Sequence, residues 1–214
     1  MSSLFQFRQN VHFTPKLDFG CAVIRSVDQP ELKRRVTADK IAAMEAVKAG
    51  RDRLEDAVGQ YSALFEANGF KNPLAHQLTS VLKKGFPTIN PFVDALLIAE
   101  MTTGHLMGVQ DWAKVRGELF YDRAVEGDVF AGMRGRVECR AGEMVLRDDA
   151  GIIASYFQGP DNRTKVGNGS KDVVFFVFSA PGIDRTSIEA ALQCVVDLCD
   201  PGGTTSEMVV RSPE

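Results

Sequence analysis

The chain has 214 residues, of which 44% are hydrophobic and 25% are charged, a composition typical of a globular protein and not of a disordered or fibrous one. Its 25 lysines and arginines face 28 aspartates and glutamates, so the formal net charge of -3 excludes a global basic field that would hold nucleic acid nonspecifically. Its first residues lack the apolar core of a signal peptide, and no apolar run approaches the roughly 20 residues that a membrane helix needs. We therefore expect a cytoplasmic protein whose contacts with nucleic acid, if it makes them, are local.

The first predicted elements are a strand and two helices. Apolar residues recur at alternate positions over residues 17–27, the period of a strand with one face in a core. Asp28 and Glu31 form a capping-box-like start for a helical region that runs to about residue 65. Gly50 interrupts its apolar stripe, which favours two helices over one.

Two further helices are predicted next in the chain. Asn72-Pro73 begins a short helix that ends near residue 84, where two lysines suit the negative end of the helix dipole. Asn90-Pro91 places an N-cap before a proline and opens a helix through about residue 103. That helix is apolar on nearly every face, so it is predicted to be buried.

The second half of the chain predicts short strands and one more helix. The strands are expected at residues 118–122, 143–147, 152–157 and 173–179. The last of them is apolar on both faces, which indicates a central strand that is covered on each side. Residues 148–151 are typical of a hairpin turn. A final helix begins near Thr186, and the residues after Asp200 are expected to form a loose tail.

Together these elements predict the α+β class, with a mixed central sheet flanked by helices. We expect one domain over residues 17–199, with a helical part at about 30–104 and a sheet-rich part at about 117–199. Residues 1–16 are assigned to an N-terminal segment and residues 200–214 to the C-terminal tail.

The sequence offers no motif for metal, cofactor or standard enzyme chemistry. Its four cysteines show neither CxxC pairing nor a histidine at ligand spacing, so no metal site is predicted. Nucleophile-elbow, P-loop, HExxH and strand-linked dinucleotide motifs do not occur. The three histidines, His12, His76 and His105, fall in different predicted elements, which favours surface or capping roles. We therefore predict no cofactor and assign no catalytic residue.

Three places hold residues that suit a ligand site. Asp94 lies in the apolar helix, so its carboxylate either bonds to nearby donors or lines a polar cavity. The glycines of residues 104–111 either let a ligand approach the backbone or simply make turns. In the polar loop of residues 161–165, Arg163 and Thr164 suit a carboxylate or phosphate, and the alternative is an ordinary solvated loop.

Four segments occur in an order and spacing that resembles one protein family: TINPFVD at residues 88–94, GVQD at 108–111, GEMVLRDD at 142–149 and RTKV at 163–166. The chain looks like a freestanding homologue of the editing and tRNA-binding domain of the bacterial phenylalanyl-tRNA synthetase β chain, its third and fourth modules. The resemblance covers about residues 17–199, so it implies that domain with little else attached.

In the synthetase, this domain is a hydrolytic checkpoint that accepts tyrosine wrongly joined to tRNA. The resemblance places a Thr-Asn pair of that pocket on Leu96-Leu97, a histidine on Gly108, and the acid that reads the tyrosine hydroxyl near Arg163. These departures remove the groups that select tyrosine and put a cation in place of an anion. The resemblance therefore implies a separate branch of the family with another ligand.

The resemblance also implies that three distant segments share one pocket. The predicted pocket residues are Asn90, Asp94, Leu97, Gly108, Gln110, Asp111, Arg163, Thr164 and Lys165. We expect Arg163 to orient an anionic or carbonyl group while Asp94 or Asp111 holds the loops in place. Hydrolysis in such a pocket relies on a positioned water and electrostatic stabilisation.

Two functions remain open at this point. The first is binding of RNA or aminoacyl-tRNA, with hydrolysis of the ester of mischarged tRNA in trans. The second is a small-molecule-binding or metabolic protein that keeps the fold without tRNA, because a fold does not fix a function. The predicted nucleic-acid contacts are Lys83, Lys84, Arg116 and Lys171. Their convergence with Arg163 and Lys165 around one pocket favours tRNA, and their dispersal favours a small ligand.

Overall fold

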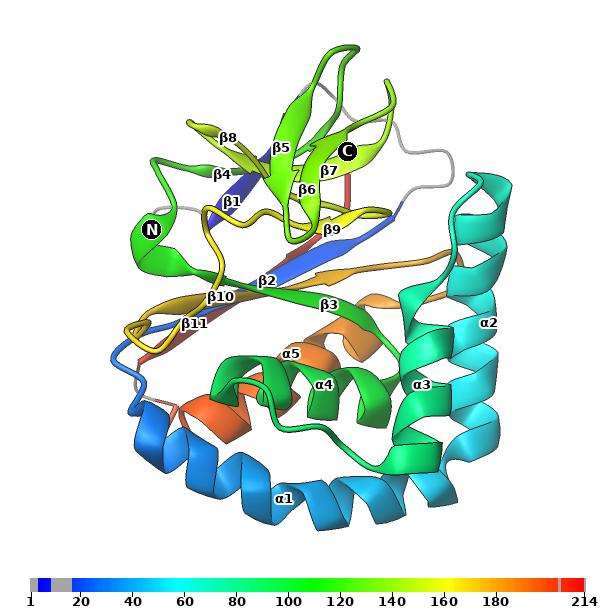
Figure 1. The fold of residues 1–214 in the computed structure, drawn as a ribbon, viewed down its shortest axis with the longest axis vertical. Coiled ribbons are helices and arrows are strands. Elements are labelled where there is room, and N and C mark those ends of the chain that lie inside the picture. The colour runs from blue at the N-terminus through cyan, green and yellow to red at the C-terminus, as the bar shows by residue number, and fades with distance from the viewer. Residues whose placement is uncertain (1–3, 9–16, 204, 214) are drawn as a thin grey trace.

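The computed structural model describes residues 4–8, 17–203 and 205–213, which form two stacked β-sheets and five α-helices (Figure 1). The helices are α1 (Gln29–Ala49), α2 (Arg51–Ala67), α3 (Pro73–Lys84), α4 (Pro91–Thr103) and α5 (Arg185–Cys199), with a short 3-10 helix η1 (Trp112–Lys114). The predicted α+β class is confirmed. Among the described helices, none has both the length and the apolar character that crossing a membrane demands.

The central layer is a four-stranded antiparallel sheet. Its order is β11 (Ser206–Arg211), β2 (Phe19–Ile24), β10 (Val173–Phe178) and β3 (Leu106–Asp111). All six residues of β10 are buried, and alternate side chains face opposite sides. Phe176 belongs to the core between the two sheets, whereas Phe175 belongs to the core shared with the helices. The prediction of a central strand covered on both faces is confirmed.

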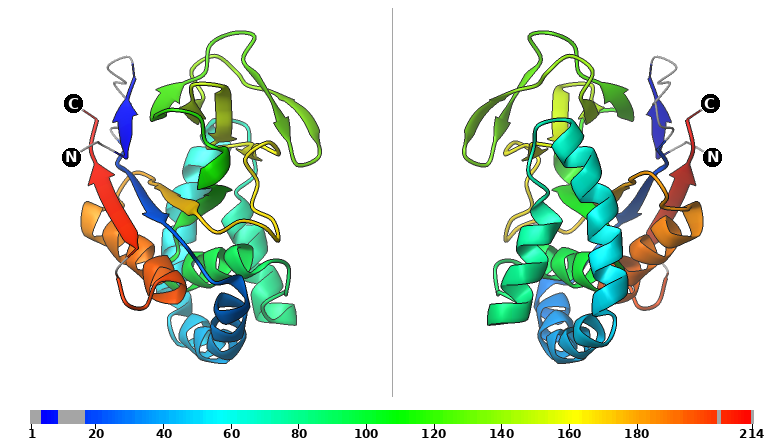
Figure 2. Two further views of the ribbon diagram at one scale, coloured as in Figure 1. Left: turned by 90° about the vertical axis from the view of Figure 1, so that its left-hand side faces the viewer. Right: turned by 90° about the vertical axis from the view of Figure 1, so that its right-hand side faces the viewer.

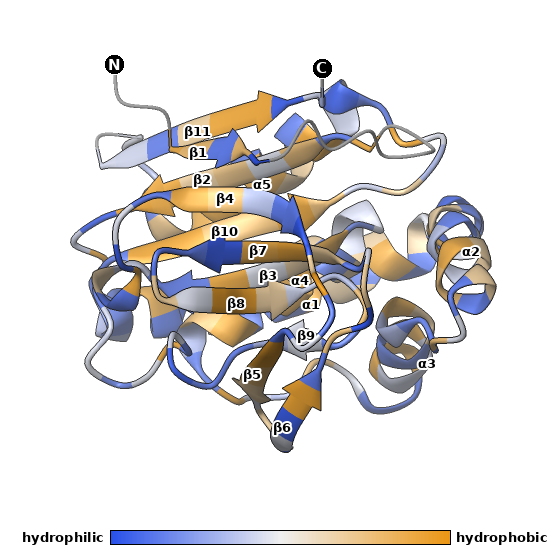
Figure 3. Ribbon diagram, turned by 90° about the horizontal axis from the view of Figure 1, so that it is seen from above, coloured by the Kyte–Doolittle hydropathy of each residue, from blue (hydrophilic) through white to orange (hydrophobic). Residues whose placement is uncertain are grey.

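The second sheet lies over the first. Its order is β1 (Phe5–Phe7), β4 (Leu119–Arg123), β7 (Met144–Asp148), β8 (Gly151–Ser155) and β9 (Gly159–Pro160). Only the pairing of β1 with β4 is parallel, so this sheet is mixed. Seen from above in Figure 3, the strands of the two sheets run in similar directions, and several of them are largely apolar. The hairpin of β5 (Val129–Gly132) and β6 (Gly135–Glu138) extends from the body (Figure 2).

The helices cover the four-stranded sheet on its other face and at one side. Figure 1 shows α1, α4 and α5 beneath the sheet and α2 and α3 standing beside it. Helix α4 supplies Phe92, Ala95 and Ile98 to the core beneath the sheet, as its apolar pattern predicts. Tyr61 of α2 donates a hydrogen bond of 2.6 Å to the carbonyl of Phe178, which joins the side helices to β10.

The structure corrects two expectations. Residues 106–111, for which glycine turns were one interpretation, form strand β3, because β10 pairs with all six of them. The C-terminal residues that were expected to be a loose tail form β11, which pairs with β2 along its whole length. Val210 of β11 is only 3% exposed and belongs to the core beneath the sheet, so backbone pairing and apolar burial both hold this strand.

Candidate functional site

Asn90 and Asp94 stabilise the start of α4. The Asn90 side chain accepts a hydrogen bond of 3.0 Å from the Phe92 backbone N–H, which is an N-cap contact. The Asp94 carboxylate is 4% exposed; it accepts 2.8 Å and 2.9 Å hydrogen bonds from the Lys40 ammonium and the Ile89 backbone N–H. Asp94 therefore joins α4 to α1, a positioning role and not that of a free base.

Gly108 makes room for an aromatic ring. It lies opposite Phe176 in the ladder between β3 and β10, and a Cβ placed on Gly108 would overlap the Phe176 ring. The absence of a side chain at this position therefore allows the core between the sheets to close. Close packing explains the glycine at position 108, whereas the sequence suggested a need for backbone freedom.

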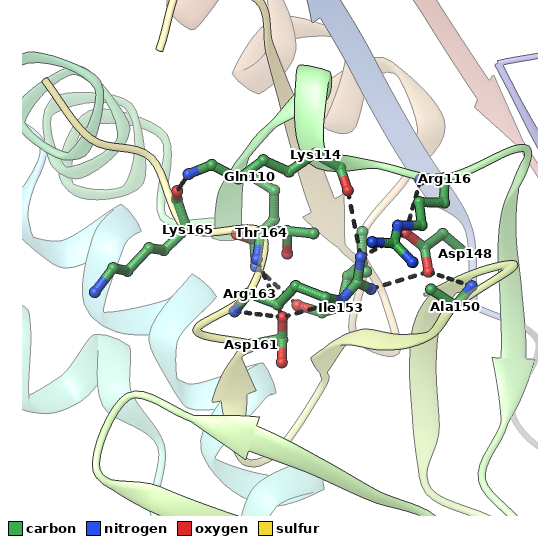
Figure 4. A network of polar contacts seen from close by, with 10 residues as sticks. All are labelled: Gln110, Lys114, Arg116, Asp148, Ala150, Ile153, Asp161, Arg163, Thr164 and Lys165. Atoms are coloured by element: carbon green, nitrogen blue, oxygen red, sulfur yellow. Dashed lines mark hydrogen bonds and ion pairs between the residues drawn. The ribbon is translucent and has the colours of Figure 1, made fainter. Parts of the chain in front are cut away.

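Arg163, Thr164 and Lys165 gather at the end of β3, as Figure 4 shows. The Arg163 guanidinium forms two hydrogen bonds, of 2.9 Å and 3.1 Å, with the Asp148 carboxylate at the end of β7. Asp148 is 2% exposed, so this bidentate pair is well shielded on its acidic side. The Lys114 ammonium donates to the Lys165 carbonyl at 2.6 Å, while the Lys165 side chain is exposed.

Asp111 fixes the same loop to β3, and Gln110 joins β3 to β8. The Asp111 carboxylate accepts a 2.7 Å hydrogen bond from the Ser170 hydroxyl, and its backbone N–H donates to the Thr164 carbonyl at 2.7 Å. The Gln110 amide donates to the Ile153 carbonyl at 2.7 Å. Asp111 thus joins two parts of the segment between β9 and β10 to the end of β3.

The predicted pocket residues therefore fall into three places. Gln110, Asp111 and the loop of residues 163–165 meet at the end of β3, and Gly108 lies earlier on the same strand. Asn90 and Asp94 lie at the start of α4, where their side chains bond to neighbouring backbone N–H groups and to Lys40 of α1. Leu97 lies on a different hollow of the molecule, between α3 and α4. Among the described residues, no hydrogen bond or ion pair joins Arg163 to Asn90 or Asp94.

The predicted nucleic-acid contacts fall into two groups. Lys83 and Lys84 form the last turn of α3. Arg116 follows η1, and Lys171 lies shortly before β10. The next residue, Asp172, accepts a hydrogen bond through its carbonyl from the backbone N–H of Trp112 in η1. Figure 1 shows the end of α3 and the end of β3 on opposite sides of the fold. The cations therefore do not converge on one pocket, although those around η1 lie near Lys165.

The hollow between α3 and α4 has a volume of about 190 Å³. Its apolar walls include Val81 of α3 and Val93, Leu96 and Leu97 of α4. Ile89, which is 67% exposed, lies on its lining as well. We call this hollow the α3–α4 pocket. Its size is below the 300 to 1,000 Å³ of typical drug-sized sites, so it suits a small group such as one amino-acid side chain.

Glu100 and Gln77 give the α3–α4 pocket its polar lining. Glu100 is 2% exposed, and its Oε1 accepts a 3.0 Å hydrogen bond from the Met107 backbone N–H. Burial raises the pKa of Glu100 to about 8, and hydrogen bonding from the Met107 backbone and from the Gln77 side chain lowers it by a smaller amount. Oε2 of Glu100 and Oε1 of Gln77 are buried without a hydrogen-bond partner among the described residues. Two convergent polar groups in an apolar hollow are typical of a ligand site.

Glu100 and Gln77 were not predicted as site residues. Glu100 carried the same signal as Asp94, an acid within an apolar helix, so its burial was open to prediction. Gln77 carried none, because its meeting with Glu100 depends on how α3 packs against α4. Leu97 was predicted as a pocket residue and Leu96 was noted only as a replacement for a polar residue, and the structure places both on this lining.

Comparison with known proteins places these features in a family. The profile described as the B3/4 domain matches residues 68–198, more than half of the chain and including α3, α4, β3 and β10. An N-terminal fragment of the phenylalanyl-tRNA synthetase β subunit from Pyrococcus horikoshii is similar at 13% identity and a TM-score of 0.46, over 60% of this chain and 47% of that fragment. The chain thus spans about half the length of that fragment. A comparison with curated proteins found no significant match.

Proposed function

Because the chain belongs to the B3/4 domain family, we propose that it binds the aminoacylated end of tRNA and hydrolyses mischarged tRNA in trans. The match agrees with the family that the sequence motifs predicted. A fold alone does not fix a function, so the proposal depends on a site that suits an aminoacyl group. In this proposal the amino-acid side chain occupies the α3–α4 pocket.

The α3–α4 pocket is the observation that carries the proposal. It lies within the matched region, its volume is about 190 Å³, and its walls are apolar with Glu100 and Gln77 on the lining. A cavity of this size holds one side chain and no more, which is the selectivity that a checkpoint for amino acids needs.

A polar stripe on α3 borders this pocket. His76 and Ser80 line the pocket, and Lys84 follows at the same four-residue spacing, so all three lie on one face of the helix. His76 and Lys84 are exposed. A cation beside the hollow suits a phosphate of the terminal nucleotides while the amino acid is held inside.

Hydrolysis in this proposal is a water attack on the ester carbonyl, which releases the free amino acid and the uncharged tRNA. The protein contributes by holding the ester beside a water and by stabilising the charge that develops on the carbonyl oxygen. No residue is assigned as nucleophile or base. Asp94 forms an ion pair with Lys40, and Arg163 forms one with Asp148. Both residues therefore stabilise the fold around the site.

The proposal is tested by incubating the protein with a panel of mischarged tRNAs and measuring loss of the aminoacyl ester. We expect accelerated deacylation of a subset of the panel, and a slower reaction after Leu97→Trp, which fills the α3–α4 pocket. Ile41→Trp on α1 is the matched control, because Ile41 is 77% exposed and is not one of the residues that line the pocket. Unchanged ester half-lives across the whole panel, together with no binding of tRNA, would contradict the proposal.

The second candidate is binding of a free small molecule, and the separation of the cations favours it. The last turn of α3, which holds Lys83 and Lys84, lies across the fold from the end of β3, after which η1 and Arg116 follow in the chain. The same tRNA panel, run beside the corresponding free amino acids, distinguishes the two functions. Binding of free amino acids without binding of any tRNA would support the second candidate.

A further inference from the structure

Two buried oxygen atoms on the α3–α4 pocket lack partners among the described residues: Oε2 of Glu100 and Oε1 of Gln77. Nearly all buried polar atoms in proteins have a hydrogen-bond partner, because a buried polar atom without one costs about 1 to 3 kcal/mol. The other carboxylate oxygen of Glu100 is already bonded to the Met107 N–H. When Glu100 is ionised beside a bound cation, the pocket presents two acceptors, Oε2 of Glu100 and Oε1 of Gln77, to the group that fills it.

The kind of group that satisfies two acceptors follows from hydrogen-bond chemistry. A primary ammonium has three donors and no acceptor, so it serves both oxygens and brings no new atom that needs a partner. A hydroxyl has one donor and leaves one of the oxygens unpaired. A primary amide supplies two donors but adds a carbonyl oxygen that the apolar walls do not satisfy.

Charge points to the same group. Glu100 has no cation within ion-pair distance among the described residues, in contrast to Asp94, Asp111, Asp122 and Asp148, which all have one. Ionising a buried carboxyl without a partner is unfavourable, and a bound cation removes that penalty. The valine and leucine side chains of the walls then contact the carbon skeleton that carries the cation.

We propose that the α3–α4 pocket recognises a primary amine at the end of an aliphatic stem, with Glu100 and Gln77 as the residues that determine this specificity. The inference rests on the proposed function in that it uses the same pocket. In the proposed deacylation of tRNA, the pocket selects aminoacyl groups whose side chains end in an amine. The free aliphatic amine is bound by the same contacts.

The test uses two probes of one carbon skeleton, 3-methylbutylamine and 3-methylbutanol, with the full chain in calorimetric titrations. We expect the amine to bind at least about tenfold more tightly than the alcohol, because a hydrogen bond to a charged group contributes about 1.5 to 3 kcal/mol. Glu100→Gln keeps the shape and the acceptor for Met107 but removes the charge, so it is expected to abolish the preference for the amine. Gln77→Leu is expected to weaken binding of the amine several-fold, which is the effect of losing one hydrogen bond.

Glu66→Gln is the matched control, since it makes the same change at an exposed position on α2. It is expected to bind both probes as the wild type does. Equal affinity for the two probes, no binding of the amine, or an unchanged preference in a folded Glu100→Gln protein would each overturn the inference. Far-UV circular dichroism and a melting curve establish that the variants are folded.

The outcome is separable from that of the proposed function. Amine binding that depends on Glu100, without deacylation of any tRNA, upholds the inference and favours the small-molecule candidate. Deacylation of mischarged tRNA that is indifferent to Glu100→Gln upholds the proposed function and rejects the inference.

Discussion

Glu100 ties the stability of the fold to pH. Its pKa is about 8 in the folded chain and near 4.5 in its ordinary state, because burial disfavours the charged carboxylate. Between these values the folded state holds a proton that the unfolded state has lost. The stabilising contribution is therefore complete below about pH 4.5 and is lost as the pH rises toward 8.

We predict that Glu100→Gln removes this pH dependence. In the wild type, the free energy of unfolding is expected to fall by up to about 1.4 kcal/mol for each pH unit across that window because of Glu100. The glutamine variant cannot ionise and lacks this slope. Chemical denaturation of both proteins at several pH values measures the difference, and parallel pH profiles would show that Glu100 is ionised at neutral pH.

The ion pair between Lys40 and Asp94 is the second residue-scale feature with a measurable consequence. Both side chains are largely shielded, at 14% and 4% exposure. We predict that Lys40→Met destabilises the fold by about 3 kcal/mol, because it leaves the Asp94 carboxylate buried without its cation. Lys40→Met combined with Asp94→Asn is expected to restore part of the loss in urea denaturation. A loss as large in the double variant as in the single one would show that the charge of Asp94 is not the cause.

At the scale of elements, the last turn of α3 tests contact with tRNA. A chain with a net charge of -3 attracts a polyanion only through a clustered cationic patch. We predict that the double variant Lys83→Ala, Lys84→Ala weakens tRNA binding and lowers the slope of log affinity against log salt by about 2, one for each lost phosphate contact. The measurement is a filter-binding titration at several salt concentrations.

The matched control for α3 is the double variant Lys33→Ala, Lys48→Ala. Both residues are exposed on α1, so the control removes the same charge from another helix. It is expected to change affinity slightly through net charge and to leave the salt slope near that of the wild type. An unchanged slope for the α3 variant would mean that the contact surface lies elsewhere, with the cations around η1 as the next group to test.

Elements differ in how far the sequence predicts them. Strand β10 and helix α4 were predictable because their apolar patterns persist whatever packs beside them. Strands β3 and β11 were not, since Gly108 and the polar residues of β11 weaken the local signal and the partner strands supply the missing stabilisation. The capping-box pattern favoured Thr186 as the start of the last helix. The observed N-cap is Asp184, two residues earlier, because both residue types suit that position.

At the scale of the whole molecule, the candidate pocket shows where sequence reasoning ends. Glu100 and Gln77 lie on different helices, and no spacing rule joins them. The motif-based pocket joined segments that the structure divides among the start of α4, the end of β3 and the α3–α4 pocket. Local patterns predict elements, whereas a site depends on the packing between them.

The packing of Phe176 against Gly108 is the contact that best tests the arrangement of the two sheets. Phe176 is 1% exposed in the core between the sheets, and its ring occupies the space that a side chain at position 108 would need. We predict that Phe176→Ala costs about 3 to 5 kcal/mol in chemical denaturation, through lost burial and the cavity left behind. Ile41→Ala is the control at a 77% exposed position and is expected to change stability by less than about 0.5 kcal/mol.

A double-mutant cycle extends this prediction to the pair. Gly108→Ala alone is expected to destabilise the protein by about 1 to 3 kcal/mol, because its methyl group meets the Phe176 ring. In the Phe176→Ala background the ring is gone, so the same methyl group enters an empty space and its cost is expected to disappear or reverse in sign. Additive effects of the two substitutions would show that β3 and β10 do not bring these residues face to face. The register of the central sheet would then have to differ from the one in which Phe176 pairs with Gly108.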